Sequence, residues 1–345
     1  MTSRLIEADK DEFDWITLLP GLGHLNMNQV KGYFKVLDNI CLEPLGRDIL
    51  NFKSPKAYSF FKDCKDNHKA WEAFEVFLHG TMLELIYKYS QESDNVSAMG
   101  FMQWQHKINA PTVKLLLQLV LTYGLGIYTQ RVGDRNNDII ISDAGRYSFD
   151  DWFFGFNHPY YREIEYRDLQ NKAIYPPQVK EQRDKNLSFS VTKTKGRNQG
   201  GDFLMEQKIK RQKMMAPKGS VDKSTWQRIS RCVDAFDRIY ENTSNLLDLK
   251  DDAGSRNIIL GNEIIEWRAF LRHSKFLDNN DSSTVFNIYG EPISSNFLNL
   301  TEKLKQKRLE YWRQHREGVH LQKISYPLLQ TFTKKADEYS DDELT

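Results

Sequence analysis

Two acidic residues spaced four apart are the clearest chemical feature of this chain. Asp202 and Glu206 lie in the segment GGDFLMEQKIKRQKMMAPK, residues 200–218. On a helix, residues four apart share one face, so both carboxylates would point in the same direction. Four basic residues follow closely, namely Lys208, Lys210, Arg211 and Lys213. A carboxylate pair beside a cationic face suits metal-assisted chemistry on a phosphate backbone, and it equally suits an ordinary surface helix.

Three histidines stand at positions where a role can be weighed. His24 follows an apolar run at 15–19, predicted to be a strand end, and a Pro-Gly turn, so it could bind a divalent metal or orient a phosphate. A capping or core histidine is the commoner case. Asp66 is a good N-cap, which places His68 in the first turn of a helix, and His158 precedes a proline in a turn. Only His24 therefore enters the candidate site.

The familiar catalytic signatures are missing from the sequence. None of the eight histidines is followed by aspartate, which excludes the helical phosphohydrolases that use such pairs as metal ligands. The patterns GxxxxGK[ST], HExxH and GxSxG do not occur either. The three cysteines lie far apart and form no CxxC pair, which argues against a zinc ribbon and a disulfide framework. A reducing compartment, nucleus or cytoplasm, is expected.

Composition limits the partners. The chain has 345 residues, of which 40% are hydrophobic, so it can bury a large core. Its net charge of +1 gives no global attraction to nucleic acid. The sequence has no apolar run of 18 residues and no apolar signal region, so neither a membrane partner nor secretion is expected. Any DNA binding must come from local basic clusters, which add Lys193, Lys195, Arg197, Lys303, Lys305, Lys307 and Arg308 to the four named above.

Apolar periodicity predicts a mainly α-helical fold with few short strands. Helical spacing is clear at 68–89, 112–128, 226–247 and 258–276, whereas 132–143 fits a helix end, a loop or a short strand. The expected organisation runs as an N-terminal tail at 1–14, a helical region at 15–180, a basic polar loop at 181–201, a helical C-terminal region at 202–332 and an acidic tail at 333–345.

Five stretches, taken together and in order, resemble a known family. They are LLPGLGHLNMNQVKGYF, GRDILNFKSPKAYSFFKDCKDNHKAWEAFEVFLHGTMLEL, FGFNHPYYREIEYRDLQ, NQGGDFLMEQKIKRQKMMAPKG and STWQRISRCVDAFDRI, and the resemblance covers roughly residues 15–245. The resemblance is to the uncharacterised, transposon-associated domain of unknown function 6589. That family brings no established activity, so the resemblance identifies kin more firmly than function.

The family context resembles transposases with a ribonuclease-H-like core and a large helical insertion. The resemblance implies that His24 matches the histidine after the strand, that 28–180 is the insertion, and that Asp202 or Glu206 is the late acid. Such chemistry holds two Mg²⁺ ions about 4 Å apart with two or three carboxylates. The chain departs from the pattern because only 14 residues precede Trp15, too few for the first strands. It thus resembles the C-terminal part of a longer transposase-like protein.

Three functions remain in view. The first is a transposon-derived, catalytically incomplete protein that binds DNA through its basic segments and needs no cofactor. The second is a helical protein-interaction module without a nucleic-acid role. The third is an intact Mg²⁺-dependent nuclease or strand transferase that combines, for instance, Asp143 with Asp202 and Glu206. The sequence leaves the oligomeric state open.

Overall fold

A computed structural model describes residues 20–155, 161, 164, 165, 168, 172, 175–190, 196–215, 222–247, 259–278, 284–293, 306 and 310. Within them the chain is mainly helical, as predicted. The elements are α3 (Leu22–Leu37), α4 (Leu42–Pro44), the π-helical η1 (Leu45–Ile49), α5 (Pro55–Lys62), α6 (Asn67–Glu92), α7 (Ala98–Lys107), α8 (Pro111–Gln118), the π-helical η2 (Leu119–Gly124), α9 (Leu125–Asn136), α10 (Ile139–Gly155), α12 (Pro177–Asn186), β1 (Ser188–Phe189), β2 (Gln199–Gly200), α13 (Gly201–Met215), α14 (Lys223–Leu246) and α15 (Gly261–His273).

The one sheet of the described residues is the antiparallel pair β1–β2, in which Ser188 pairs with Gly200 and Phe189 with Gln199. Two strands of two residues cannot form a ribonuclease-H-like core, so the described part of the chain gives that expectation no support. The predicted strand at 15–19 lies outside the described residues.

Local caps explain where several helices begin. The Ser54 hydroxyl accepts a hydrogen bond from the Ala57 amide at 3.1 Å, and Pro55 opens α5. The Asp66 carboxylate accepts from the amides of His68 and Lys69 at the start of α6, which confirms the predicted cap. His68 is exposed in the first turn of that helix.

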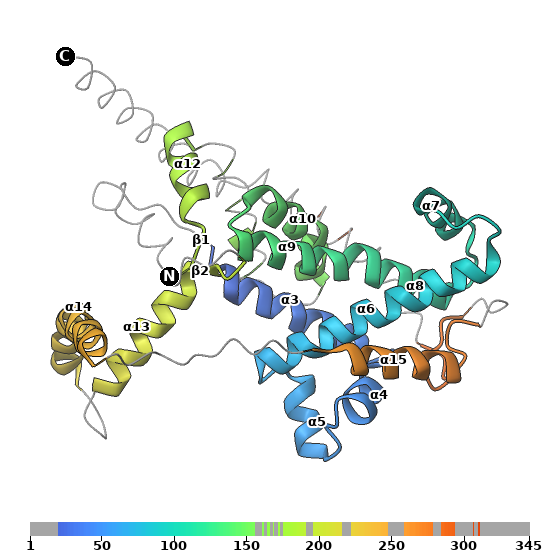
Figure 1. Ribbon diagram of the computed structural model, residues 1–345, viewed down its shortest axis with the longest axis horizontal. Coiled ribbons are helices and arrows are strands. Elements are labelled where there is room, and N and C mark those ends of the chain that lie inside the picture. Colours follow the sequence, from blue (N-terminus) through green and yellow to red (C-terminus); the bar gives the residue numbers. More distant parts are fainter. Residues whose placement is uncertain are drawn as a thin grey trace.

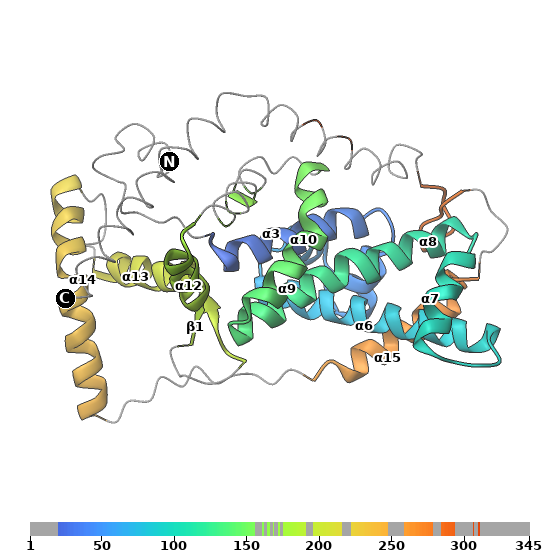
Figure 2. The same ribbon diagram turned by 90° about the horizontal axis from the view of Figure 1, so that it is seen from above.

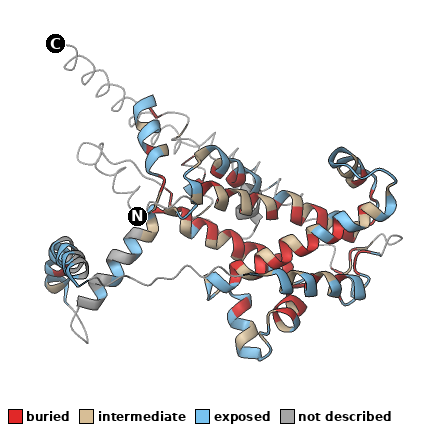
Figure 3. Ribbon diagram, viewed as in Figure 1, coloured by how far each residue is buried: buried red, intermediate tan, exposed pale blue. Residues whose placement is uncertain are grey.

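The core lies where α3, α6 and the run from α8 to α9 pack together, with α15 on the other side of α6 (Figure 1). Tyr33 of α3 is fully buried, and its ring meets Phe74 and Phe77 of α6 edge to face. The Tyr33 hydroxyl donates to the Leu119 carbonyl at 2.8 Å, where the helix widens into η2. Figure 3 shows this buried seam running along the facing sides of the helices.

Residues 132–143 form the junction of a tight helical hairpin. Helix α9 ends at Asn136, Asn137 adopts the left-handed conformation at φ 54°, and α10 starts at Ile139. A Cβ at Gly145 would lie 2.3 Å from the Gln130 backbone nitrogen, so only glycine permits this close approach of the two helices. The open alternatives for this segment are thus resolved as a helix end, a turn and a helix start.

Two further segments bear on the expectations. The polar segment 181–201 is not a loop throughout, because α12 extends to Asn186 and the two strands follow. Pro177 at the first helical position and a series of good helix formers account for α12 despite its weak apolar pattern. The helical run Pro111–Asn136 is long and apolar enough to cross a membrane, but more than half of its apolar 18-residue window is buried inside the fold, as in a core helix.

Helices α13 and α14 extend away from this packed core (Figures 1 and 2). The base of α13 contacts α3 and β2, and its far part contacts α14, which crosses it at the end of the molecule. We call α13 and α14 together the projection.

Candidate functional site at the start of helix α3

Two glycine-containing segments, residues 21–24 and 200–206, lie next to each other in the structure. His24 and Asp202 are in contact although they are 178 residues apart in the sequence. One Asp202 oxygen accepts a hydrogen bond from the Gly23 amide at 3.2 Å, and the other accepts from the His24 amide at 2.7 Å. These are the second and third amides of α3, the donors that an N-cap side chain normally satisfies. Gly21, the N-cap residue itself, has no side chain to offer. Asp202 therefore caps α3 from another helix.

The glycines make room for this carboxylate. A Cβ at Gly21 or at Gly23 would lie 3.0 Å from the Asp202 Oδ2 atom. A Cβ at Gly200 would lie 2.5 Å from Asp202 Oδ1 and 3.0 Å from the Gly23 nitrogen. At Gly201 a Cβ would meet nothing within 4 Å. Three of these four glycines thus have a packing role that their sequence pattern did not reveal.

His24 and Glu206 form the outer layer of the site. The His24 Nε2 atom lies 2.9 Å from Glu206 Oε1, and both side chains are about half exposed to solvent. An exposed pair of this kind contributes about 0–1 kcal/mol to stability. The structure therefore brings together the three residues assigned to the candidate site from the sequence: His24, Asp202 and Glu206.

The geometry favours a structural joint over a metal centre. A negative carboxylate at the positive end of a helix is electrostatically favourable, and each Asp202 oxygen already accepts an amide hydrogen bond. Among the described residues, no three His, Cys, Asp or Glu side chains are grouped so that they could hold a metal ion. The assignment of His24, Asp202 and Glu206 as Mg²⁺ ligands stays a prediction.

A network of buried hydrogen bonds lies close to the contact between Asp202 and the start of α3, which we call the joint. The Gln29 amide of α3 donates to Gln130 Oε1 of α9 at 2.6 Å, and the Gln130 amide donates to Asp134. The Ser142 hydroxyl of α10 donates to the same Asp134 carboxylate at 2.5 Å. Burial raises the pKa of Asp134 to about 6, and the negative charge of Asp202 adds to the rise. Sequence spacing did not predict this network of hydrogen bonds, because its residues come from three separate helices.

The basic residues expected to bind DNA are only partly described. Lys210 and Lys213 are exposed on α13, and Arg197 is exposed just before β2. Lys208 and Arg211 lie on α13, but their side chains fall outside the described set. Six predicted residues lie wholly outside the described residues: Lys193, Lys195, Lys303, Lys305, Lys307 and Arg308.

Three further basic residues were not predicted as part of the site. Lys223, Arg228 and Arg231 are exposed on α14, which packs against α13. Residues 207–233 contain eight Lys or Arg and a single acid, Asp222, which caps α14 by accepting from the Thr225 amide at 2.6 Å. A count of charge along the chain could have found this signal.

Asp143 belongs to a different cluster. Arg146 of α10 forms a two-pronged contact with Glu165, at 3.1 and 3.0 Å, and reaches Asp168 at 2.7 Å. Arg183 of α12 also donates to Asp168, while Asp143 pairs with Arg146 at 3.2 Å. The cluster fixes α12 to α10 through buried ion pairs. Asp143 is thus engaged in this cluster and not in the contacts of Asp202.

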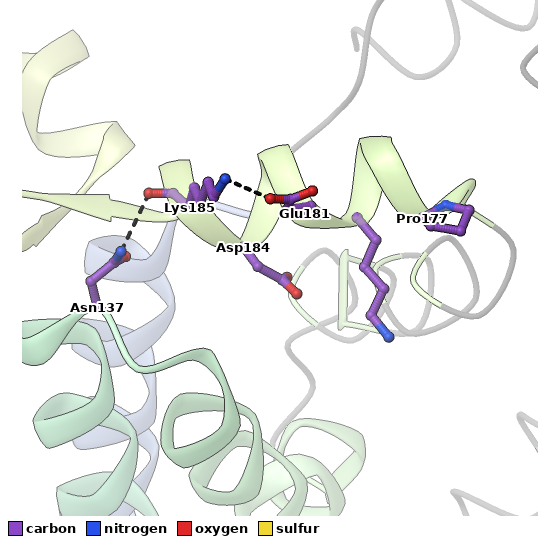
Figure 4. A pocket seen from close by; sticks show the side chains of 6 residues that line it. Asn137, Pro177, Glu181, Asp184 and Lys185 are labelled. Atoms are coloured by element: carbon purple, nitrogen blue, oxygen red, sulfur yellow. Dashed lines mark hydrogen bonds and ion pairs between the residues drawn. The ribbon is translucent and has the colours of Figure 1, made fainter. Parts of the chain in front are cut away.

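An open hollow of about 470 Å³ beside α12 offers no comparable chemistry (Figure 4). Lys185 pairs with Glu181 at 2.6 Å, and the Lys185 carbonyl accepts from the Asn137 amide at 3.3 Å. Lys180 and Asp184 complete a rim on which positive and negative charges balance. We find no feature here that selects a ligand.

Comparison with protein-family models, with curated proteins and with solved structures finds no match, so the site is interpreted from its own geometry.

Proposed function

We propose that this chain is a transposon-derived, transposase-like protein that binds the nucleic-acid backbone through its projection. The carrying observation is the concentration of charge: residues 207–233 hold eight basic residues and one acid in a chain whose net charge is only +1. Nucleic acids attract such a local basic surface even when the whole protein is nearly neutral. We also propose that residues 15–245 are related to the transposon-associated family that their motifs resemble, which is the ground for the transposase-like part of the proposal.

The attachment of the projection supports a binding role. Asp202 fixes the first turn of α13 to the start of α3, and Lys210 and Lys213 lie two to three turns further along the same helix. A rigid base reduces the entropy lost when the basic side chains engage phosphates. The joint thus presents the charge away from the core.

In this proposal the acidic pair acts structurally. Asp202 holds α13 in place, and Glu206 pairs with His24 at the surface. Catalysis by strand transfer is proposed to be lost, and the proposed place of action is inside the cell, nucleus or cytoplasm. The free thiols of Cys41, Cys64 and Cys232 agree with a reducing compartment.

Fluorescence anisotropy with labelled double-stranded DNA tests the proposal. The informative variant reverses four exposed charges of the projection: Lys210→Glu, Lys213→Glu, Arg228→Glu and Arg231→Glu. The matched control reverses four exposed lysines that lie outside the projection, on the surface of the packed part of the molecule: Lys53→Glu, Lys56→Glu, Lys65→Glu and Lys107→Glu. Both variants change the net charge equally.

We expect the projection variant to lose roughly 100-fold or more in affinity at low salt, because four phosphate contacts become repulsive, and the control to lose far less. The proposal fails if the wild-type chain does not bind at low salt, or if both variants weaken binding equally. Adding Mg²⁺ to the same titration and analysing the DNA for cleavage tests the nuclease alternative.

A helical protein-interaction module is the second candidate. The observation that favours it is the exposure of large apolar side chains on α14, among them Phe236, Ile239 and Leu246. Large exposed apolar patches mark sites of contact with proteins or membranes. DNA binding that is absent while a protein complex forms would favour this candidate.

A further inference from the structure

One face of α14 carries a heptad pattern of small and apolar residues. The positions alternate in steps of four and three: Thr225, Ile229, Cys232, Phe236, Ile239, Thr243 and Leu246. We call these seven residues the α14 stripe. Such spacing is typical of a helix that packs along a second helix. No charged residue belongs to the stripe.

The stripe is exposed over most of its length. Ile229 is buried within the single chain, but Phe236, Ile239 and Leu246 are 55%, 61% and 85% exposed. Cys232 and Thr243 are exposed as well. Helix α14 forms the outer end of the projection, away from the core helices (Figure 2). A second helix can therefore reach the stripe.

We propose that the α14 stripe pairs with the α14 stripe of a second copy of this chain, in antiparallel orientation. In an antiparallel pair the alternating positions of the two helices face each other. One register pairs six of the seven stripe residues: Phe236 faces Ile239 of the second copy, Cys232 faces Thr243, and Leu246 lies at the edge of the contact opposite Ile229, which its own chain already covers in large part. Thr225 lies beyond the paired length. The same register repeats each contact by symmetry, because two-fold pairing matches the surface with itself.

The charges of α14 favour this orientation. Its first part, up to Arg231, carries Lys223, Arg228 and Arg231 and no acid, whereas the part from residue 234 onwards carries three acids and one arginine. Antiparallel pairing sets the basic end of one helix beside the acidic end of the other. Parallel pairing would set like charges side by side. The paired length, residues 229–246, is about 27 Å, or five helical turns.

The inference does not depend on DNA binding. The two proposals are separated by their wild-type readouts: sedimentation of the wild-type chain without DNA reports on pairing alone, and anisotropy reports on DNA binding. Arg228 and Arg231 contribute to both proposals, so the charge-reversal variant is used only for DNA binding. If both hold, the pair would carry two basic projections.

Sedimentation velocity of the full chain measures the pairing. We expect a species of twice the 40.5 kDa chain mass that dissociates on dilution. The double variant Phe236→Asp and Ile239→Asp should be monomeric at every concentration, with unchanged helicity, because both side chains are exposed in the single chain. The control variant Gln227→Asp and Ser230→Asp adds the same charge off the stripe and should remain dimeric.

Disulfide trapping tests the register. In a Cys64→Ser background, Thr243→Cys should form a covalent dimer with Cys232 of the second copy under mild oxidation, since facing core positions suit a disulfide. Ser230→Cys, off the stripe, should not form one, and the Thr243→Cys link should vanish with Cys232→Ser. A monomeric wild-type chain, a dimer that survives the stripe variant, or a wild-type dimer linked through Cys232 alone, as parallel helices would give, overturns the inference.

Discussion

Asp202 supplies to α3 the cap that Gly21 lacks, and this long-range contact is the residue-scale basis of the account. Replacing Asp202 by alanine leaves the Gly23 and His24 amides without their acceptor, which should lower the free energy of unfolding by about 1 kcal/mol. Asp202→Asn should lose less, because its amide oxygen can still accept one of the two bonds. Urea unfolding monitored by circular dichroism measures both. Equal stability of the alanine variant and the wild type would show that the carboxylate has no capping role.

Two neighbouring glycines, Gly200 and Gly201, differ in how close they lie to the Asp202 carboxylate, so they can be compared directly. Gly200→Ala places a Cβ 2.5 Å from Asp202 Oδ1, so the joint must shift, and we expect a loss of about 1–3 kcal/mol in unfolding free energy. Gly201→Ala meets nothing within 4 Å and should be neutral or slightly stabilising. Thermal melts of the two neighbouring variants make the comparison. A Gly201 variant as unstable as the Gly200 variant would contradict the proposed packing.

Asp134 predicts a pH dependence with a defined sign. Its folded-state pKa, about 6, lies above that of an unfolded aspartate, so the folded state binds more protons between these values. Asp134 therefore destabilises the fold at neutral pH, and the cost shrinks as the pH falls through 6. Relative to Asp134→Asn, which cannot titrate, the wild type should gain about 1 kcal/mol between pH 7 and pH 5. If the difference in unfolding free energy between the two proteins is the same at pH 7 and at pH 5, the prediction is wrong.

At the scale of elements, Trp267 is the largest buried side chain that attaches α15 to α6, beside the ion pairs of Arg268 and Arg272 with Glu84. Trp267 is fully buried against α6, where its indole N–H donates to the Thr81 hydroxyl at 3.0 Å. A Cβ at Gly80 would lie 2.6 Å from this indole, so the indole can pack here only because residue 80 has no side chain. Trp267→Ala should cost about 3–5 kcal/mol of stability. Trp226→Ala, at a tryptophan 37% exposed on α14, should cost far less, and chemical denaturation can rank the two.

Local signals predicted the helices well. Apolar periodicity and the Asp66 cap act within one or two turns, so they can be recognised from neighbouring residues. Helix α12 was missed because its sequence, PQVKEQRDKN, has almost no apolar stripe; the ion pairs of Arg183 hold it in place instead. Those partners are close in space rather than in sequence.

The candidate site shows the same division. The four-residue spacing predicted that Asp202 and Glu206 share one face of a helix, and both lie on α13. The approach of His24 to them was expected only through the family resemblance, and the structure places the three together. Spacing could not predict this approach, because it depends on where the start of α13 meets the start of α3. The capping role of Asp202 appears only when the amides of Gly23 and His24 are in place. The basic residues in the first part of α14 were visible in the sequence, but the net charge of the whole chain, which is near zero, gives no sign of them.

At the scale of the whole molecule, charge and core are separated. The packed helices hold the hydrophobic core, and the described parts of the strongest basic segment, 207–215 and 223–233, lie on α13 and α14 of the projection. Since the chain is nearly neutral overall, any nucleic-acid affinity should be short-ranged and easily screened by salt. Comparing the salt dependence of the projection variant with that of the core-lysine control therefore measures how much of the affinity belongs to the projection.

The most direct test is the affinity of the full chain for double-stranded DNA across a salt series. Four to six phosphate contacts predict that log K falls against log salt with a slope of roughly −4 to −5. The projection variant with Lys210, Lys213, Arg228 and Arg231 reversed should lose most of that slope, and the core-lysine control should keep it. A wild-type chain that does not bind at low salt, or a slope unchanged by the projection variant, would contradict the account.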